Sequence, residues 1–137
     1  MREIKFMGKS KRGMNPWVKG FLLIDELDNK YISFKPDDDN FQLCPVFDES
    51  VGQFTGLQDK NGVDIYEGDI LSIHSPCIDK SLPWKPARNC RIGWHKRGCW
   101  NLFKSITDEH VGIVGITLSN LQYFTIIGNI HENKELL

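Results

Sequence analysis

The sequence has no long hydrophobic run. Its longest apolar stretches are residues 21–24 and 111–116, and glycines interrupt the second of them. A helix that spans a membrane needs about 20 consecutive apolar residues, so we expect no membrane segment. No apolar stretch follows residues 1–6 either, and a secretory signal would require one. We therefore expect a soluble protein that stays in the cytoplasm.

An excess of charge of one sign is also missing. The chain has 17 lysine and arginine residues against 18 aspartate and glutamate residues, and its formal net charge is −1. No strong global field therefore draws it to nucleic acid or to an anionic membrane. The chain has 4 cysteines in 137 residues. Without a secretory signal we expect a reducing compartment, in which these cysteines stay free thiols.

Recognisable catalytic and cofactor motifs are missing as well. The sequence contains no GxGxxG, no phosphate-binding loop and no Ser or Cys nucleophile at a recognisable elbow. Glu67 and Asp69 flank Gly68, but acid–base catalysis needs two groups held in one cleft. Asp69 is better suited to capping its turn through backbone N–H groups. We expect neither an enzyme nor a bound cofactor.

What the sequence does contain is a series of short, strand-like segments. Residues 3–7 alternate polar and apolar side chains, which is typical of a half-buried strand. Residues 17–25 and 30–34 flank an Asp–Asn turn and predict a hairpin. Residues 41–47 predict another strand, in which Pro45 favours an edge position or a break.

A second hairpin is predicted further along the chain. Residues 90–94 and 98–103 are short strand candidates on either side of a basic tip. The three prolines of residues 75–89 indicate a long irregular loop before them. Together these segments predict a mainly β protein with minor α-helix.

Glycines punctuate the central part of the chain. Asn61-Gly62 is among the strongest tight-turn dipeptides, since both residues tolerate a positive φ. Four glycines are placed where a turn needs a positive φ or a close backbone approach: Gly56, Gly62, Gly68 and Gly128. The apolar residues around them are spaced to bury one face: Phe54, Leu57, Ile65, Ile70, Ile127 and Ile130.

The same region carries a resemblance to a known family. The matching stretches are MREIKF at residues 1–6, QFTGL at 53–57, DKNG at 59–62, IYEGDI at 65–70 and IGNIHEN at 127–133. They anchor both ends and the middle of the chain, in a long and ordered pattern. On these residues the sequence resembles the YopX family of phage and prophage proteins.

The resemblance implies a phage or prophage origin, and hence the cytoplasm of a bacterial host cell. It implies an SH3-like small barrel in residues 51–137, with a β-rich N-terminal segment, residues 1–50, packed on it. It also suggests self-association. It supplies no activity, because the family is not tied to a defined biochemical function.

One set of residues has the chemistry of a zinc site. Cys77, Cys90, His95 and Cys99 are proper tetrahedral donors, and pairing of the second hairpin would let Cys90 and Cys99 approach each other across the strands. The set lacks the closely spaced cysteine pair with which structural zinc sites usually begin. We therefore expect no metal, with small thiols filling a core as the simpler interpretation.

A second set has the chemistry of nucleic-acid contact. Lys96 and Arg97 lie between Trp94 and Trp100, and basic residues interleaved with aromatic ones hold phosphates and stack on bases. The alternative is a solvated turn beside core tryptophans. The leading expectation is a non-enzymatic protein of unknown role that binds another protein, or itself, through barrel surface loops. A nucleic-acid-binding accessory protein of phage replication or regulation is the alternative.

Overall fold

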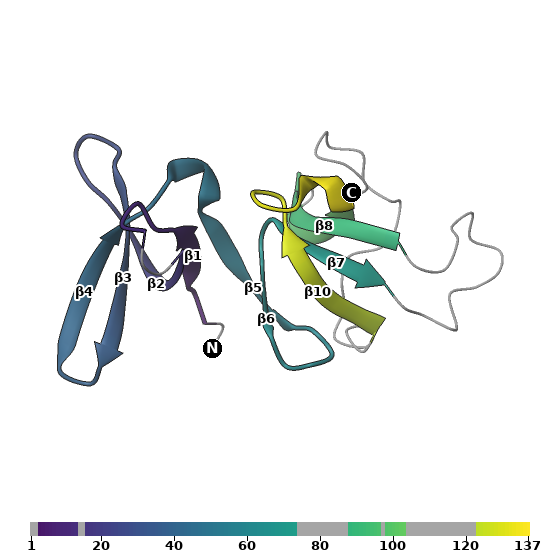
Figure 1. Cartoon of the computed structure of the whole chain (residues 1–137), viewed down its shortest axis with the longest axis horizontal. Helices are drawn as coiled ribbons and strands as arrows, with labels where there is room; N and C mark the ends of the chain where they lie inside the picture. The colour runs from purple at the N-terminus through teal and green to yellow at the C-terminus, as the bar shows by residue number, and fades with distance from the viewer. Residues whose placement is uncertain (1–2, 14–15, 74–87, 97, 104–122) are drawn as a thin grey trace. The chain divides into compact units, whose positions relative to one another are not determined.

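The protein is described by a computed structural model that covers residues 3–13, 16–73, 88–96, 98–103 and 123–137. The chain forms two compact units, Met1–Gly56 (unit 1) and Leu57–Leu137 (unit 2). The described elements are strands and short 3-10 helices (Figure 1), so the mainly β class is confirmed. The division into domains at residues 1–50 and 51–137 stays a prediction. None of the helices in the described ranges is long and apolar enough to cross a membrane.

Unit 1 is an antiparallel sheet. Its strands follow the order β4-β3-β2-β1-β5, and β5 leads out of the unit into a hairpin with β6. The strands are β1 (Phe6–Lys9), β2 (Trp17–Ile24), β3 (Lys30–Asp37), β4 (Asn40–Pro45) and β5 (Gly52–Gln58). The pairing of β2 with β3 confirms the first predicted hairpin. β4 lies at the edge of the sheet and ends at Pro45, as the proline predicted.

The core of unit 1 lies on one face of this sheet. Leu22, Ile32 and Cys44 are directly opposite one another on β2, β3 and β4, and residues opposite one another share a face. Ile32 and Cys44 are buried and pack with Val18 and Val46. The side chains between them along each strand must therefore point to the other face, because successive residues alternate.

The segment that follows β1 and the segment that follows β4 meet at one place in unit 1. Ser10, just past β1, forms an antiparallel bridge with Val46, just past β4. The N–H of Lys11 donates to the carbonyl of Pro45 at 2.9 Å, and that of Phe47 donates to the carbonyl of Lys9 at 3.0 Å. The C-terminal end of β4 is thereby covered, while no strand of the described ranges pairs with the rest of its outer edge.

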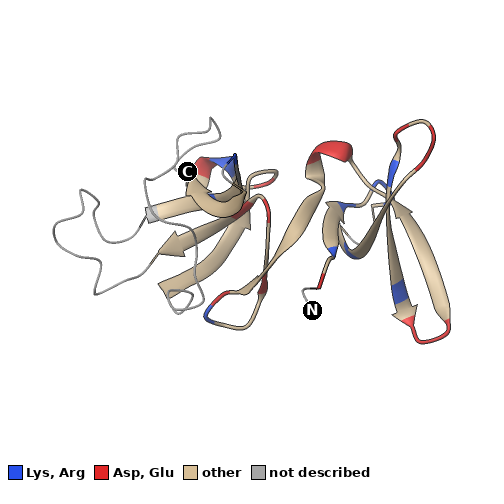
Figure 2. Ribbon diagram, turned by 180° about the vertical axis from the view of Figure 1, so that it is seen from behind, with Lys and Arg blue, Asp and Glu red and all other residues tan. Residues whose placement is uncertain are grey.

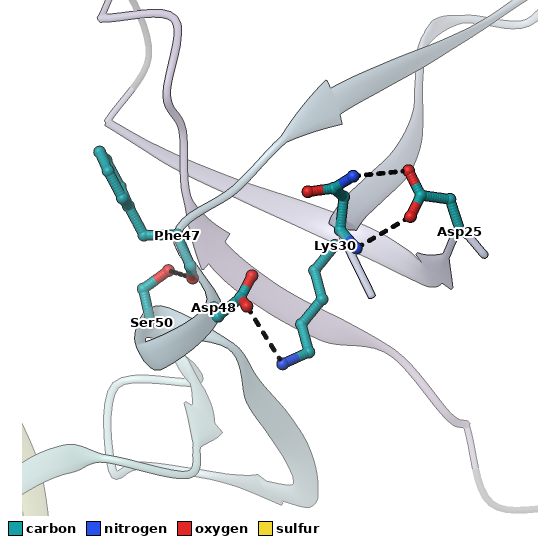
Figure 3. A network of polar contacts seen from close by, with 6 residues as sticks. Asp25, Lys30, Phe47, Asp48 and Ser50 are labelled. Atoms are coloured by element: carbon teal, nitrogen blue, oxygen red, sulfur yellow. Dashed lines mark hydrogen bonds and ion pairs between the residues drawn. The ribbon is translucent and has the colours of Figure 1, made fainter. Parts of the chain in front are cut away.

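Short polar contacts fix the turns of unit 1 (Figure 3). The Asp25 carboxylate accepts hydrogen bonds from Leu27 N and Asn29 N, both at 2.9 Å, and from the Asn29 side chain. The hydrogen bond from the side-chain amide of Asn29 is the main reason why the pKa of Asp25 lies below its usual value. In the 3-10 helix η1 (Asp48–Ser50), the Ser50 hydroxyl donates to the carbonyl of Phe47 at 2.6 Å.

Unit 2 contains a second antiparallel sheet, with the order β10-β7-β8-β9. Its elements are β6 (Asp64–Tyr66), β7 (Asp69–Ile73), β8 (Arg88–His95), β9 (Cys99–Phe103), β10 (Phe124–Asn129) and the 3-10 helix η3 (Lys134–Leu136). The pairing of β8 with β9 confirms the second predicted hairpin. In the described ranges β10 and β9 are the two edges, with β7 and β8 between them, so these strands form no closed barrel. The SH3-like form of this unit stays a prediction.

The apolar core of unit 2 gathers on this sheet and on β6. β7 is buried along its whole length, and the fully buried side chains include Ile65, Leu71, Cys90 and Ile92. A run of five buried residues in β7 requires that both of its faces be covered. The core cluster comprises Ile65, Leu71, Ile73, Cys90, Ile92, Trp100, Leu102 and Phe124.

A buried carboxylate ties the β5–β6 turn to β10. Asp59 is 6% exposed, and its Oδ1 accepts the N–H groups of Asn61 at 2.9 Å and of Val63 at 3.0 Å. Its Oδ2 accepts the N–H of Ile126, which lies 67 residues away in the sequence, at 3.1 Å. One side chain thus closes the Asn61-Gly62 turn and holds it against a distant strand.

We expect Asp59→Asn to lower the free energy of unfolding by roughly 1.5–3 kcal/mol, because an amide would leave a buried N–H without its acceptor. Urea denaturation followed by circular dichroism measures this change. Asp38→Asn removes the same charge from an exposed turn residue and should change the free energy by less than about 0.5 kcal/mol. Equal effects of the two substitutions would contradict the role given to Asp59.

Candidate functional site

Four large apolar side chains lie exposed on one face of unit 1. Phe21 and Leu43 are both opposite Ser33, and Leu23 is opposite Tyr31, so these residues share a face. Phe41, two residues before Leu43 on β4, shares it as well. We call Phe21, Leu23, Phe41 and Leu43 the apolar face. Their exposed fractions are 63%, 46%, 66% and 50% respectively.

The apolar face is the reverse side of the sheet that carries the core of unit 1. Single exposed hydrophobic residues are normal on a protein surface, whereas a contiguous group marks a site of interaction. These four residues come from β2 and β4, on either side of β3, with Ser33 and Tyr31 between them on the same face. The Nζ of Lys35 lies 4.6 Å from the centroid of the Phe41 ring, which places a cation at the border of the face.

The residues predicted for nucleic-acid contact lie at the β8–β9 hairpin. Trp94 and Trp100 are a cross-strand pair, and their rings meet edge to face with centroids 4.9 Å apart. Trp94 is 50% exposed, whereas Trp100 is 9% exposed and belongs to the core. Lys96 is exposed beside them in the turn, and Arg97 lies outside the described residues. The hairpin therefore presents one accessible ring and one lysine.

The cysteines predicted as zinc donors do not come together in the described part of unit 2. The register of β8 with β9 places Cys99 opposite His95 at the tip of the hairpin. Cys90 precedes Arg91, which pairs with Phe103 at the far end of the hairpin, so Cys90 lies five strand positions, or about 16 Å, from the tip. The register of the hairpin therefore does not bring Cys90 and Cys99 together, as the zinc alternative would require.

Nothing in the described residues completes that zinc set. Cys77 and the side chain of His95 lie outside the described part of the chain, and Cys90 is fully buried on the core side of β8. No group of three His, Cys, Asp or Glu side chains with metal-binding geometry occurs within the described ranges.

The carboxylate between β6 and β7 serves the backbone. Asp69 is 5% exposed, and its Oδ2 accepts the N–H of Tyr66 at 2.8 Å. This bond closes the turn in which Gly68 has a φ of +89°, a value that L-residues with a side chain rarely adopt. Asp69 therefore caps its turn, as the sequence predicted.

A second turn packs against this one. The Asn129 side chain accepts the N–H groups of His131 at 3.0 Å and of Glu132 at 3.1 Å. The N–H of Ile130 donates to the carbonyl of Gly68 at 2.9 Å. The EGD and GNIHEN segments, some 60 residues apart in the sequence, are thus neighbours in unit 2, joined through their backbones.

The turn glycines follow the expected geometry in two different ways. Gly62 and Gly68 lie in turns, with φ values of +78° and +89°. Gly56 has a φ of +83° but lies inside β5, so its predicted place in a turn is wrong. Gly128 lies inside β10 rather than in a turn, and there a Cβ would come within 2.7 Å of Asn133 Cγ. At Gly128 the constraint is therefore close approach by a side chain, since the Asn133 Oδ1 accepts the N–H of Asn129 at 3.2 Å.

A family model described as YopX protein matches residues 10–137 of the chain. The chain belongs to the YopX family. The match covers both packed turns, the Asp59 turn and the apolar face, so all these features lie within the part that the YopX model describes.

A solved structure also resembles the chain over its full length. Protein EF1440 from Enterococcus faecalis is 25% identical in sequence, with a TM-score of 0.56, and the alignment covers 100% of this chain and 99% of that one. No curated protein matched the chain. The comparisons therefore establish the YopX family and a shared fold.

Sequence reasoning did not find the apolar face. Phe21 and Leu23, and likewise Phe41 and Leu43, alternate with other residues in the sequence, which was a usable signal. However, Leu22 lies between Phe21 and Leu23, and Cys44 follows Leu43. Both are apolar, so either set could have formed the core. Only the pairing of the strands and the burial of Ile32 decide which set is exposed.

We expect Gly128→Ala to lower the free energy of unfolding by about 1–3 kcal/mol, because the added methyl group would displace the Asn133 side chain. Asn133→Ala removes the obstacle, so the double variant should lose less than the sum of the two single changes. A double-mutant cycle measured by urea denaturation tests this coupling.

Leu27→Ala provides the control for that cycle. Leu27 is an exposed turn residue of unit 1, and its combination with Gly128→Ala should be additive to within about 0.5 kcal/mol. Strict additivity of Gly128→Ala with Asn133→Ala would contradict the role given to the Asn133 side chain.

Proposed function

We propose that the chain is a non-enzymatic protein-binding or assembly module of phage or prophage origin, acting in the cytoplasm of a bacterial host. The observation that supports this proposal is the apolar face of unit 1. Removing about four large side chains from water would supply several kcal/mol of binding free energy, at roughly 25 cal/mol for each Å² buried. We take unit 2 to be an SH3-like fold whose sheet is open in the described ranges.

The buried acidic groups favour a structural interpretation over a catalytic one. Asp59 and Asp69 each accept backbone N–H groups in their own turns. A carboxylate engaged in this way holds the fold and is not positioned to exchange protons with a substrate. The residues that carry the family resemblance are thus accounted for by turns and core.

The proposal is tested by changing the apolar face. Phe21→Ser with Phe41→Ser removes two exposed rings while leaving the opposite face of the sheet intact. We expect this double variant, used as tagged bait in extracts of bacterial or phage-infected cells, to lose at least about tenfold of the specifically captured protein, because each buried ring contributes a kcal/mol or more.

The matched control removes two exposed apolar side chains elsewhere. Leu27→Ser with Val63→Ser changes residues that are 83% and 47% exposed and lie in turns. This control should capture the same proteins as the unchanged chain. If the face variant captures them equally well, the apolar face is not the binding surface and the proposal is wrong.

The β8–β9 hairpin supports a second candidate, a nucleic-acid-binding accessory function. The observation that favours it is the half-exposed ring of Trp94 beside the exposed Lys96. An exposed ring stacks on any base, and a neighbouring lysine attracts the phosphate.

We expect this second function to appear as binding of labelled single-stranded DNA or RNA at about 50 mM salt that weakens steeply as salt is raised. Trp94→Ala with Lys96→Glu should reduce the affinity at least tenfold in fluorescence anisotropy, given about 1–3 kcal/mol for one stacked base. Lys60→Glu, a charge reversal in the β5–β6 turn, is the control. The absence of binding at low salt would rule this candidate out.

A further inference from the structure

The outer edge of β4 has backbone groups that its own sheet does not use. β4 ends the strand order, so β3 pairs with one edge of it only. Val46 donates its N–H to the carbonyl of Lys30 at 3.0 Å. In an antiparallel pair the backbone groups of successive residues point alternately toward and away from the neighbouring strand, so this bond fixes the direction for every residue of β4. Gln42 and Cys44 therefore direct their backbone groups toward β3, whereas Phe41 and Leu43 direct theirs outward.

The contacts of Pro45 support this assignment. Its carbonyl points away from β3, because it accepts the N–H of Lys11. Residues 9–11 thus cover the outer edge from Pro45 onward. In the described part of the chain no strand lies against this edge at Phe41 and Leu43, and both residues are exposed. Outward N–H and C=O groups on an edge strand are a template for a further strand.

We propose that this edge pairs with the same edge of a second copy of the chain, antiparallel about a two-fold axis through Gln42. The inference rests on the proposed function and names one partner for it. In this register Phe41 of each copy is opposite Leu43 of the other. The outward N–H and C=O groups of Phe41 and Leu43 in both copies are then all paired, in four intermolecular hydrogen bonds.

The two neighbouring symmetric registers leave more of the outward N–H and C=O groups without a hydrogen-bond partner. An axis through Leu43 would pair Phe41 with Pro45, which has no N–H and whose carbonyl is already taken by Lys11. An axis through Phe41 would pair Leu43 with Asp39, which lies in the turn outside β4. Of these three axes, the one through Gln42 pairs β4 residues that each have an N–H and a carbonyl directed outward.

Charge complementarity also favours this arrangement. Asp37 ends β3, and Asp38 and Asp39 form the turn at the tip of the β3–β4 hairpin, which is red in Figure 2. In the proposed register the pairing ends where Asn40 of one copy meets Cys44 of the other. The acidic turn of one copy therefore comes next to Pro45 of the other, where Lys11 is hydrogen-bonded. The acidic turn of each copy is thereby brought next to the exposed Lys11 of its partner.

Pairing also extends the apolar face across both copies. Phe41 and Leu43 lie on the same face as Phe21 and Leu23, and directly opposite residues of paired strands share a face. Phe41 of one copy would therefore pack beside Leu43 of the other. A symmetric pair of this kind is self-complementary and closed, so it forms dimers and not filaments.

Sedimentation velocity over a range of concentrations tests the proposal with the full chain. We expect a reversible monomer–dimer equilibrium. Leu43→Pro removes an N–H that β3 does not use, which edge strands tolerate, and should weaken the dimer by about tenfold to a hundredfold. Leu43→Ala keeps that N–H and should weaken it less. A chain that stays monomeric at every soluble concentration, or a Leu43→Pro dimer of unchanged affinity, would overturn the proposal.

A cross-link tests the register independently of any loss of folding. Gln42 would face its own copy at a non-hydrogen-bonded position, where Cα atoms are about 4.5 Å apart and a disulfide fits. Gln42→Cys should therefore give a disulfide-linked dimer under mild oxidation, at a level well above that of the unchanged chain. Lys35→Cys, exposed on β3, is the matched control. Equal cross-linking of the two variants would overturn the register.

A charge exchange tests the contact of the acidic turn with Lys11. Lys11→Glu should weaken the dimer, and adding Asp38→Lys should restore it, which a loss of folding would not do. The failures of the two proposals are distinguishable. If the chain stays monomeric but captures a protein through Phe21 and Phe41, self-pairing is wrong and the protein-binding function stands. If neither occurs, both are wrong.

Discussion

The alternation of side chains along paired strands is the constraint on which the structure of unit 1 depends. Because β2, β3 and β4 are held in one register, burying Ile32 requires that Leu22 and Cys44 point the same way. It also requires that Phe21 and Leu43 point to the opposite face. The protein has enough apolar residues for both faces of this sheet, although the core of the unit needs only one. The exposed group is therefore a direct consequence of the sequence pattern and the hydrogen-bonded ladder.

Unit 2 is organised differently, by polar side chains that serve the backbone. Asp59, Asp69 and Asn129 each accept two or more N–H groups or close a tight turn. Buried carboxylates in such positions are charge-assisted hydrogen-bond acceptors, which are stronger than neutral ones. The segments of unit 2 on which the sequence resembles the YopX family largely form these turns. Their sequence pattern consequently describes how the unit is built.

Much of the local structure could be read from the sequence, because its signals are local. The Asp–Asn and Asn-Gly turns, the two hairpins and the edge position of β4 all depend on residues within a few positions of one another. The register of β8 with β9 could not be read in this way, and it is this register that separates Cys90 from Cys99. The hydrogen bond from Ile126 to Asp59 and the bridge between Ser10 and Val46 join residues far apart in the chain. No local sequence pattern predicts them. The sequence predicted correctly that position 128 needs a glycine. The reason is the close approach of the Asn133 side chain and not a turn.

Pro45 has a consequence for the alignment of β4 that goes beyond ending the strand. If β4 slipped by one residue against β3, Pro45 would occupy a position that must donate an N–H to β3, and a proline has none to donate. The same slip would turn Phe41 and Leu43 inward and Cys44 out to solvent. A slipped register would therefore lose a backbone hydrogen bond at Pro45. It would also expose the buried side chain of Cys44. A single proline on an edge strand therefore decides which of two apolar faces the molecule shows to its surroundings.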